Sequence, residues 1–475
     1  MLITYKYFYI ENCSKMLNFR QNPEKMLKKL TKQPQLEMYK TVLLNLINPE
    51  HELCQLAKKI NWEQLEKDLE PNYSRIGRPS VPIRTIVGLL LLKQIYNLGD
   101  ETVMERWVEN PYWQHFSGEI YFQYRPPFDP SDFVHFRKRM GEEGMQRIFK
   151  ESILLFSKEE LKKEVKEVRV DTTVQEKNIT FPTDRKLYEK VIAYCFRIAR
   201  KEGIELKRSF PREARKLRTA LRFSHHPRHH KKKVKLEKQF YRLTVKIHNS
   251  LVNRMDPENG EHDDIFDLMY RILTQKRNDS DKVYSIHEPE VHCIAKGKEH
   301  KKYEFGNKSS FAYTRLGGII VGALAFEGNP FDGHTLKPQI EQVKELTGIA
   351  PRYAIVDRGY KGQNQIGRTK VVMPKNLKRE SRYLKKKREE RCRSRSGVEA
   401  LISHLKLDHR MLRNYLKGTQ GDKINTLMAA AAYNMKKWMA KRKAEIFILI
   451  RFLFFSTPIW VCVNTTTSRV RKNGY

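Results

Sequence analysis

The sequence predicts an α/β fold in which a sheet is flanked by helices and preceded by a helical region. Three observations lead to this prediction. Residues 167–174 alternate apolar and polar side chains, as strands do, and carry Asp171. Residues 352–356 form a short apolar run, typical of a buried strand, that Asp357 and a glycine turn end. Residues 79–141 instead contain runs of helical length separated by short turns.

Composition indicates a globular protein with a polyanionic partner. The 475 residues leave room for about two to three domains. An apolar fraction of 40% with 11% aromatic residues excludes a disordered basic tail. Lys and Arg number 92 against 55 Asp and Glu, a net charge of +37. This surplus favours nucleic acid as the partner, although a highly soluble or ribosome-associated basic protein is an alternative.

Cysteine usage and the two ends of the chain favour a cytosolic protein without a membrane span. Six cysteines lie scattered without a C-x-x-C pair, which argues against a zinc site and for a reducing compartment. The first twenty residues lack the apolar core of a secretory signal. Residues 446–463 are mostly apolar, but Arg451 and Pro458 interrupt them. A helix docked on a core is therefore favoured there over a membrane span.

The helical region at 71–160 is the candidate DNA-binding domain. An apolar run at 86–95 is followed by a second helix at about 101–108. Ser131 is a plausible N-cap for a third helix, and this helix ends in a basic run. The basic residues of that run are Arg137, Lys138 and Arg139. Short turns and a basic last helix suit a helix-turn-helix-like DNA reader, although an ordinary helical subdomain would show the same spacing.

Residues 184–280 are predicted to form a basic helical insertion after the first strand. Lys231, Lys232 and Lys233 lie in its most basic part, and we expect them to follow a phosphate backbone. Four histidines between 225 and 230 suggest a metal tract. No acid or cysteine supports that interpretation, and the neighbouring lysines would repel a cation.

The remaining elements complete an α/β domain, which we assign to 161–440. Strand signals return at 301–306 and 317–326, and a helix near 336–346 precedes the strand that ends at Asp357. A helix that carries Glu399 follows. Outside the two predicted domains we expect an N-terminal helical arm at 1–70 and an apolar and basic tail at 441–475.

Three carboxylates, Asp171, Asp357 and Glu399, are the candidate metal ligands. Cutting or joining a phosphodiester needs one oxygen activated and another stabilised, which two divalent ions roughly 4 Å apart achieve. Mg²⁺ prefers oxygen ligands and keeps several waters, so three acids suffice. Asp184 and Asp332 compete for a ligand role, but neither ends a strand as clearly.

The helix around Glu399 is predicted to be amphipathic. At about 100° per residue, one narrow stripe contains four charged residues. These are Arg395, Glu399, Lys406 and Arg410. An adjoining apolar stripe contains Val398, Ile402, Leu405 and Leu412. Glu399 would then lie at the rim of the buried face, with the basic residues gripping a DNA strand. The alternative is a row of i,i+4 salt bridges such as Arg395 with Glu399.

These motifs together resemble those of DDE transposases of the bacterial insertion-sequence four and five group, from about residue 75 to 438. The matching motifs lie at 78–82, 128–137, 170–174, 181–184, 285–291, 296–298, 303–306, 329–336 and 357–360. The last family motif reads Tyr, two residues, Arg, three residues, Glu, six residues, Lys. Arg395, Glu399 and Lys406 match it, but Cys392 replaces the tyrosine. That departure concerns an accessory DNA contact rather than the metal site.

The resemblance implies an RNase H-like fold, a mixed sheet flanked by helices in which Asp171, Asp357 and Glu399 cluster in space. It also implies Mg²⁺ or Mn²⁺ as cofactor, double-stranded DNA as partner (terminal inverted repeats and target DNA) and an oligomer on that DNA. Arg395 and Lys406 would position the strand, and Arg358, Tyr360 and Arg410 would contact DNA. Two alternatives remain: a DNA-binding regulator or inactive relic, and a metal-dependent nuclease without strand transfer.

Overall fold

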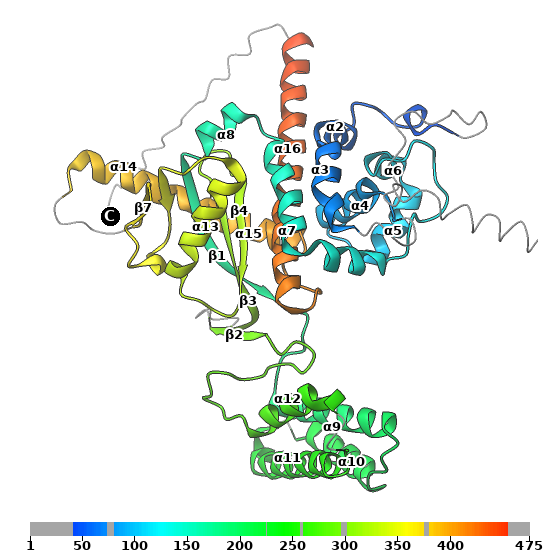
Figure 1. The fold of residues 1–475 in the computed structure, drawn as a ribbon. Helices are drawn as coiled ribbons and strands as arrows, with labels where there is room; N and C mark the ends of the chain where they lie inside the picture. The colour runs from blue at the N-terminus through cyan, green and yellow to red at the C-terminus, as the bar shows by residue number, and fades with distance from the viewer. Residues whose placement is uncertain are drawn as a thin grey trace, which may run out of the picture.

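The structure, a computed structural model, describes residues 41–73, 80–224, 226–256, 260–295, 302–374 and 380–454. Figure 1 shows a helical N-terminal part, a sheet with helices on both faces, and a set of four helices that lies away from the sheet. The predicted sheet flanked by helices is confirmed. The histidine at 225 and most of the predicted N-terminal arm lie outside the described residues, as does the tail beyond residue 454.

The N-terminal part contains short helices packed around the buried helix α4. Its helices are α2 (Glu52–Lys59), α3 (Trp62–Leu69), α4 (Ile83–Ile95), α5 (Asp100–Glu109), α6 (Pro111–Phe116), α7 (Asp132–Leu154) and α8 (Lys158–Glu164), with short 3₁₀ turns at Leu43–Asn45 and Glu70–Asn72. Helix α4 is buried along almost its whole length because it is apolar on every side.

The start of α7 differs from the prediction. Ser131 precedes the helix, but it has helical backbone angles and its side chain makes no capping hydrogen bond. Instead, Asp129 Oδ1 accepts the Ser131 N–H at 2.8 Å. The helix also continues past the predicted basic run, with a kink at Gly141, where φ is 59°. A positive φ costs glycine little, so α7 bends there and continues to Leu154.

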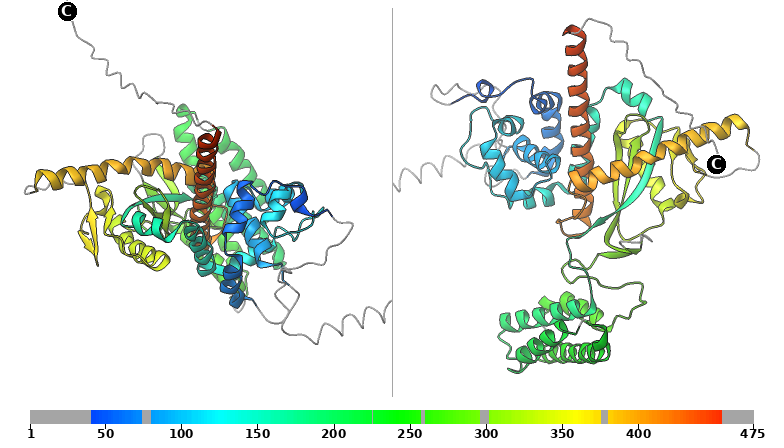
Figure 2. Two further views of the ribbon diagram at one scale, coloured as in Figure 1. Left: turned by 90° about the horizontal axis from the view of Figure 1, so that it is seen from above. Right: turned by 180° about the vertical axis from the view of Figure 1, so that it is seen from behind.

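The sheet is mixed and has the order β2-β3-β1-β5-β7-β6, with β4 also paired to β3. Its strands are β1 (Glu167–Glu176), β2 (His292–Ala295), β3 (Tyr303–Thr314), β4 (Ile320–Phe326), β5 (Tyr353–Ile355), β6 (Gln365–Ile366) and β7 (Thr369–Val372). Strand β1 runs antiparallel to β3 and parallel to β5. Figures 1 and 2 show helices α13 (Asp332–Thr347) and α14 (Arg382–Arg393) crossing opposite faces of the sheet.

The predicted basic insertion corresponds to four helices with a core of their own. They are α9 (Asp184–Lys201), α10 (Phe210–Arg222), α11 (His230–Val252) and α12 (Asp263–Thr274), with 3₁₀ turns at Pro227–His229 and Gly260–His262. Their apolar faces bury residues such as Val191, Phe240 and Met269 against one another. Two connecting segments join this helical unit to β1 and β2 (Figure 1).

A buried lysine anchors these connecting segments to the long helix α16 (Gly418–Phe454). Lys177, which follows β1, donates to the carbonyl oxygens of Leu416 and Gly418 at 2.9 and 2.8 Å. It also pairs with Asp422 on α16 at 3.1 Å and with Glu288 at 3.4 Å. Because Glu288 lies in the segment that returns from the helical unit, one ammonium group holds both connections against the start of α16.

Helix α16 joins the N-terminal part to the sheet. It packs against α4 and α7 on one side and against β4 on the other, and residues such as Leu427, Ala431 and Met435 are fully or almost fully buried. Of the segment at 446–463 that was predicted to dock as a helix, residues 446–454 continue α16, and the rest lies outside the described residues. Among the described residues, no helix is long and apolar enough to cross a membrane.

Candidate active site

The parallel pairing of β1 with β5 places Asp171 beside Asp357. Arg169 is paired with Ile355, and two residues further along each chain come the two aspartates. At these positions β5 has already ended, so the two neighbouring strand segments present their acids close together. Each carboxylate is oriented locally: Asp171 Oδ1 accepts the Thr172 N–H, and Asp357 Oδ1 accepts the Gly359 N–H, both at 2.8 Å.

Arg395 spans the two aspartates. Its Nη2 atom lies 3.9 Å from Asp171 Oδ2 and 4.0 Å from Asp357 Oδ2, so these oxygens are less than 8 Å apart. Arg395 belongs to a 3₁₀ turn (Ser394–Ser396) between α14 and α15 (Gly397–Asp408). Its Nε atom is buried and has no hydrogen-bond partner among the described residues. The guanidinium group therefore marks a position where the two acids favour positive charge.

The environment of Asp171 disfavours its negative charge. The pKa of Asp171 is raised to about 6, chiefly because burial penalises the ionised form. The Thr172 N–H and Arg395 counteract this shift, whereas Asp357 and Asp332 add to it. Two acids that repel each other at a partly buried position are typical of a site completed by a cation.

Asp332 lies close to this site, although the sequence placed it below Asp171 and Asp357 as a candidate metal ligand. It begins α13, and its Oδ1 accepts hydrogen bonds from Thr172 Oγ1 at 2.8 Å and Lys308 Nζ at 3.0 Å. Asp184, the other competing acid, is exposed at the start of α9 in the helical unit. Asp332 and Asp184, which the sequence ranked together, therefore lie in different parts of the molecule.

Glu399 has no contact with the two aspartates among the described residues. It lies in the first turn of α15, exposed beside the buried Val398, and pairs with none of the described residues. Among the described residues, Glu399 does not join Asp171 and Asp357 in a group whose ligand atoms all lie within 4.8 Å of one another. Arg395 thus links Asp171 with Asp357, whereas no hydrogen bond or ion pair among the described residues links Glu399 to either of them.

The predicted charged stripe around Glu399 is wrong because the helix is shorter than expected. Arg395 precedes α15, and Arg410 follows it with a φ of 60° in the left-handed region. Beyond Asp408 the chain folds back, and the N–H groups of Met411 and Leu412 donate to carbonyl oxygens of Leu405 and Lys406. Leu412, assigned to the buried stripe, is 54% exposed.

Two predicted DNA contacts are buried. Arg137 is 5% exposed, and its guanidinium group binds both oxygens of Asp100, at 3.1 and 2.7 Å. Lys93 also pairs with Asp100, so this cluster holds α7 against α4 and α5. Tyr360 is fully buried. Arg137 and Tyr360 are therefore not DNA-contacting residues, because neither side chain reaches the surface.

The other predicted DNA contacts lie on several surfaces. Lys138 and Arg139 are exposed on α7, with Arg139 over the Tyr73 ring. Lys231 and Lys232 are exposed at the start of α11, where Lys233 pairs with Glu237 at 3.8 Å. Of the other three, Arg358 follows Asp357, Lys406 lies in the last turn of α15, and Arg410 follows that helix. Arg358 is exposed, Lys406 is half-buried, and Arg410 is half-buried over the Tyr415 ring.

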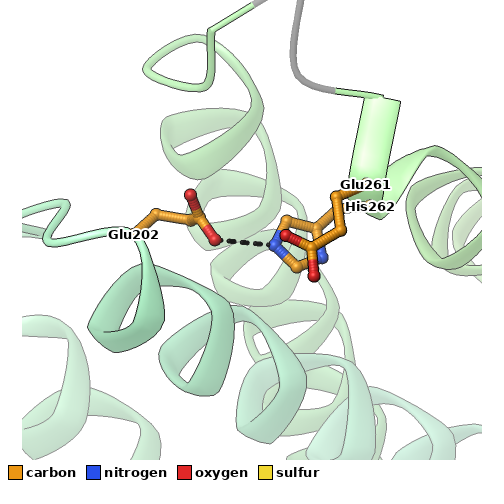
Figure 3. Close-up of side chains that lie close together, drawn as sticks. All are labelled: Glu202, Glu261 and His262. Carbon is orange, nitrogen blue, oxygen red and sulfur yellow. Dashed lines mark hydrogen bonds and ion pairs between the residues drawn. The ribbon is translucent and has the colours of Figure 1, made fainter.

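A separate group of potential metal ligands occurs in the helical unit. Glu202, Glu261 and His262 place one ligand atom each within 4.8 Å of the others (Figure 3). His262 Nε2 and Glu202 Oε1 are 2.9 Å apart. The ammonium group of Lys201 pairs with Glu261 and lies 4.0 Å from Glu202. Because Lys201 already supplies positive charge here, we interpret this group as a set of ion pairs that holds α9 against the start of α12.

Two family profiles match the chain. Residues 41–139 match the family described as Transposase domain (DUF772), and residues 274–435 match the family described as Transposase DDE domain. The second range contains Asp332, Asp357 and Glu399, whereas Asp171 lies between the two ranges. The chain is also similar to a Rhizobium meliloti protein described as "Uncharacterized protein ORF8 in nfe locus". The two are 40% identical over 192 residues, which are 40% of this chain and 93% of that protein. No solved structure matches the chain.

Proposed function

Because the chain belongs to the DDE transposases of the insertion-sequence four and five kind, we propose that it cuts DNA at the terminal inverted repeats of an insertion sequence. It then joins the freed 3′-hydroxyl to target DNA. The pairing of β1 with β5, which leaves Asp171 and Asp357 side by side, carries this proposal. The order of the central strands also supports an RNase H-like catalytic domain.

The family depends on divalent metal ions, and the residues at the aspartates fit such an ion. The donors are carboxylate oxygens, which Mg²⁺ and Mn²⁺ prefer. The guanidinium group of Arg395 occupies the space between two of them as a stand-in cation. Asp171 and Asp357 would hold the metal, and Glu399 would complete the set from α15. When bound, the metal would supply an activated water and stabilise the leaving oxygen.

The neighbouring basic residues would position the DNA strand. Arg395 reaches both aspartates, so a small displacement of its side chain would let it contact a phosphate next to them. Lys406, on the same helix as Glu399, would add positive charge along that strand. No covalent intermediate between protein and DNA is required.

DNA recognition would use the N-terminal helices and the helical unit. Lys138 and Arg139 on α7 support a helix-turn-helix-like role for the N-terminal part. Lys231 and Lys232 support phosphate contacts by the helical unit. We further propose that the protein acts as a homo-oligomer on nucleoid DNA, because two element ends must be joined in one reaction.

The test separates cleavage from binding. Asp171→Ala, Asp357→Ala and Glu399→Ala proteins are expected to shift terminal-repeat DNA in a gel as the wild type does. Their Mg²⁺-dependent cleavage should fall about a hundredfold or more, because charge stabilisation in the transition state is lost. Asp184→Ala, which removes an exposed acid from the helical unit, is the matched control and should cleave normally. If all three site variants kept full cleavage, the proposal would be wrong.

A DNA-binding regulator or inactive relic is a second candidate. The exposed position of Glu399, with no partner among the described residues, and Cys392 in place of the family's tyrosine favour it. A donor element with both terminal repeats distinguishes the candidates: the transposase gives joined products, the relic gives none, and a nuclease gives only cut ends.

A further inference from the structure

Asp332 is an additional carboxylate beside Asp171 and Asp357, and only one of its oxygens is occupied. Oδ1 is held by the Thr172 hydroxyl at 2.8 Å and by the Lys308 ammonium at 3.0 Å. Oδ2 has no hydrogen-bond or ion-pair partner among the described residues. Lys308 is itself 8% exposed and donates to the Pro330 carbonyl oxygen at 2.7 Å, so the position of Oδ1 is firmly fixed.

The unoccupied oxygen is directed toward Asp357. A Cβ atom added to Gly359 would lie 2.9 Å from Asp332 Oδ2 and 2.9 Å from Asp357 Oδ1. The two carboxylate oxygens are therefore less than 6 Å apart, and the absence of a side chain at Gly359 leaves the space between them free. Two carboxylates at this separation repel each other unless a cation lies between them.

Asp332 approaches the aspartates from the side opposite to Arg395. Thr172 follows Asp171 on β1, and successive side chains of a strand point to opposite faces. Asp332 on α13 contacts Thr172, whereas Arg395, between α14 and α15, contacts Asp171. Arg395 supplies a cation on its own side of the sheet, whereas on the α13 side no cation of the described residues pairs with Oδ2.

An independent feature points to a missing partner at the same place. Tyr360 is fully buried, and its hydroxyl has no hydrogen-bond partner among the described residues. The carboxylates of Asp171, Asp332 and Asp357 all act on this hydroxyl. The nearby Thr335 hydroxyl donates to the Asp332 carbonyl oxygen, and its effect on the Tyr360 pKa opposes that of the three carboxylates. A buried hydroxyl without a partner is unfavourable unless a ligand or an ordered water satisfies it.

We propose that Asp332 is a fourth carboxylate of the metal site. Thr172 and Lys308 fix Oδ1, and Oδ2 is presented to the ion that Asp357 holds, in the space that Gly359 leaves open. Lys308 acts on the site only through Asp332, whose negative charge it partly neutralises. This inference rests on the proposed function, since it adds a ligand to the same metal site.

The test measures metal binding in the full-length protein without DNA. Mn²⁺ is titrated, and the free ion is followed by electron paramagnetic resonance to obtain affinity and stoichiometry. Asp332→Asn is expected to weaken Mn²⁺ binding about tenfold or more. Asp171→Asn should weaken it as well, and Asp184→Asn, the matched control in the helical unit, should leave it unchanged. Lys308→Gln keeps the carboxylate and removes its ammonium partner, so binding should be retained or tightened.

The outcomes separate this inference from the proposed function. If Asp171→Asn weakens Mn²⁺ binding and Asp332→Asn does not, the role of Asp332 is overturned while the metal site stands. If the wild type shows no saturable binding, both fail. If Lys308→Gln weakens binding and lowers the unfolding temperature as much as Asp332→Asn does, Asp332 has only a structural role. Should Asp332→Asn fail to fold, Asp332→Glu keeps the charge, displaces the oxygen and should still bind Mn²⁺ more weakly.

Discussion

At the scale of single residues, the buried imidazole of His409 makes stability depend on pH. His409 is 1% exposed, and its Nδ1 lies 3.2 Å from the Gln94 carbonyl oxygen on α4. Burial lowers its pKa to about 4, well below the usual range. Between pH 4 and 6.5 the unfolded chain therefore binds a proton that the folded protein does not, so stability falls as pH is lowered through this window.

Replacing His409 tests this dependence. Acidification from pH 7.5 to pH 5 is expected to cost the wild type about 2 kcal/mol through this residue. His409→Gln should be less sensitive to the same change, and urea unfolding at the two pH values measures the difference. His404→Gln, at an exposed histidine in the preceding helix α15, is the control. An identical pH dependence in His409→Gln and the wild type would contradict the assignment.

Individual site residues were predictable only where the signal was local. Asp171 and Asp357 could be predicted because each interrupts or ends an apolar strand pattern. The position of Asp332 beside these acids could not be predicted, because it depends on a contact with Thr172, 160 residues away in the chain. Arg137 and Tyr360 have side chains suited to DNA contact, but tertiary packing buries both, and no local pattern encodes that packing.

At the scale of elements, the turn after β5 holds the aspartates in place, and Gly359 is its most constrained position. An added methyl group would lie 2.9 Å from oxygens of both Asp332 and Asp357, too close for an undisturbed carboxylate pair. Gly359→Ala is expected to displace these carboxylates and to reduce cleavage about a hundredfold. Overpacking should cost about 1–3 kcal/mol of stability.

Parallel cleavage and gel-shift assays check this expectation. DNA binding by Gly359→Ala should remain, because the basic surfaces lie on other elements. Gly99→Ala is the control, since an added methyl group there would meet only Thr102 Oγ1 at 3.6 Å. Wild-type cleavage by Gly359→Ala would show that the turn tolerates a side chain and that the spacing of the two acids is unimportant.

Helices and strands were predicted well where their patterns were strong, and poorly at their ends. The apolar run at 86–95 lies within α4, and the alternation at 167–174 lies within β1. The helix around Glu399 was extended too far because no glycine or proline marks its end. Arg410 adopts the left-handed conformation there without being a glycine. The order of strands was not predictable, because β1 pairs with β3 and β5 across long stretches of chain.

At the scale of the whole molecule, the charge of +37 is expected to make DNA binding strongly dependent on salt. Replacing Lys231, Lys232 and Lys233 together by alanine should weaken DNA binding at all sequences. If all three contact phosphates, the slope of log affinity against log salt should fall by about 2 to 3. Fluorescence anisotropy with duplex DNA at several salt concentrations measures this slope.

The control removes the same charge elsewhere. Lys158, Lys162 and Lys163 are exposed on α8, and their triple alanine variant should change the slope much less. Equal effects of the two triple variants would mean that net charge alone, and not the start of α11, determines the dependence on salt. A preference for a polyanionic partner could be predicted from composition, and the basic run at 231–233 from the local sequence, whereas the exposure of Lys231 and Lys232 at the start of α11 required the structure.

A crystal of the full-length protein grown with Mn²⁺ tests the central claim most directly, because anomalous diffraction locates the ion. The account predicts an ion bonded to carboxylate oxygens of both Asp171 and Asp357, at about 2.0–2.3 Å, with Arg395 displaced from between them. Mn²⁺ bound only elsewhere, with Arg395 still spanning the two aspartates, would contradict it.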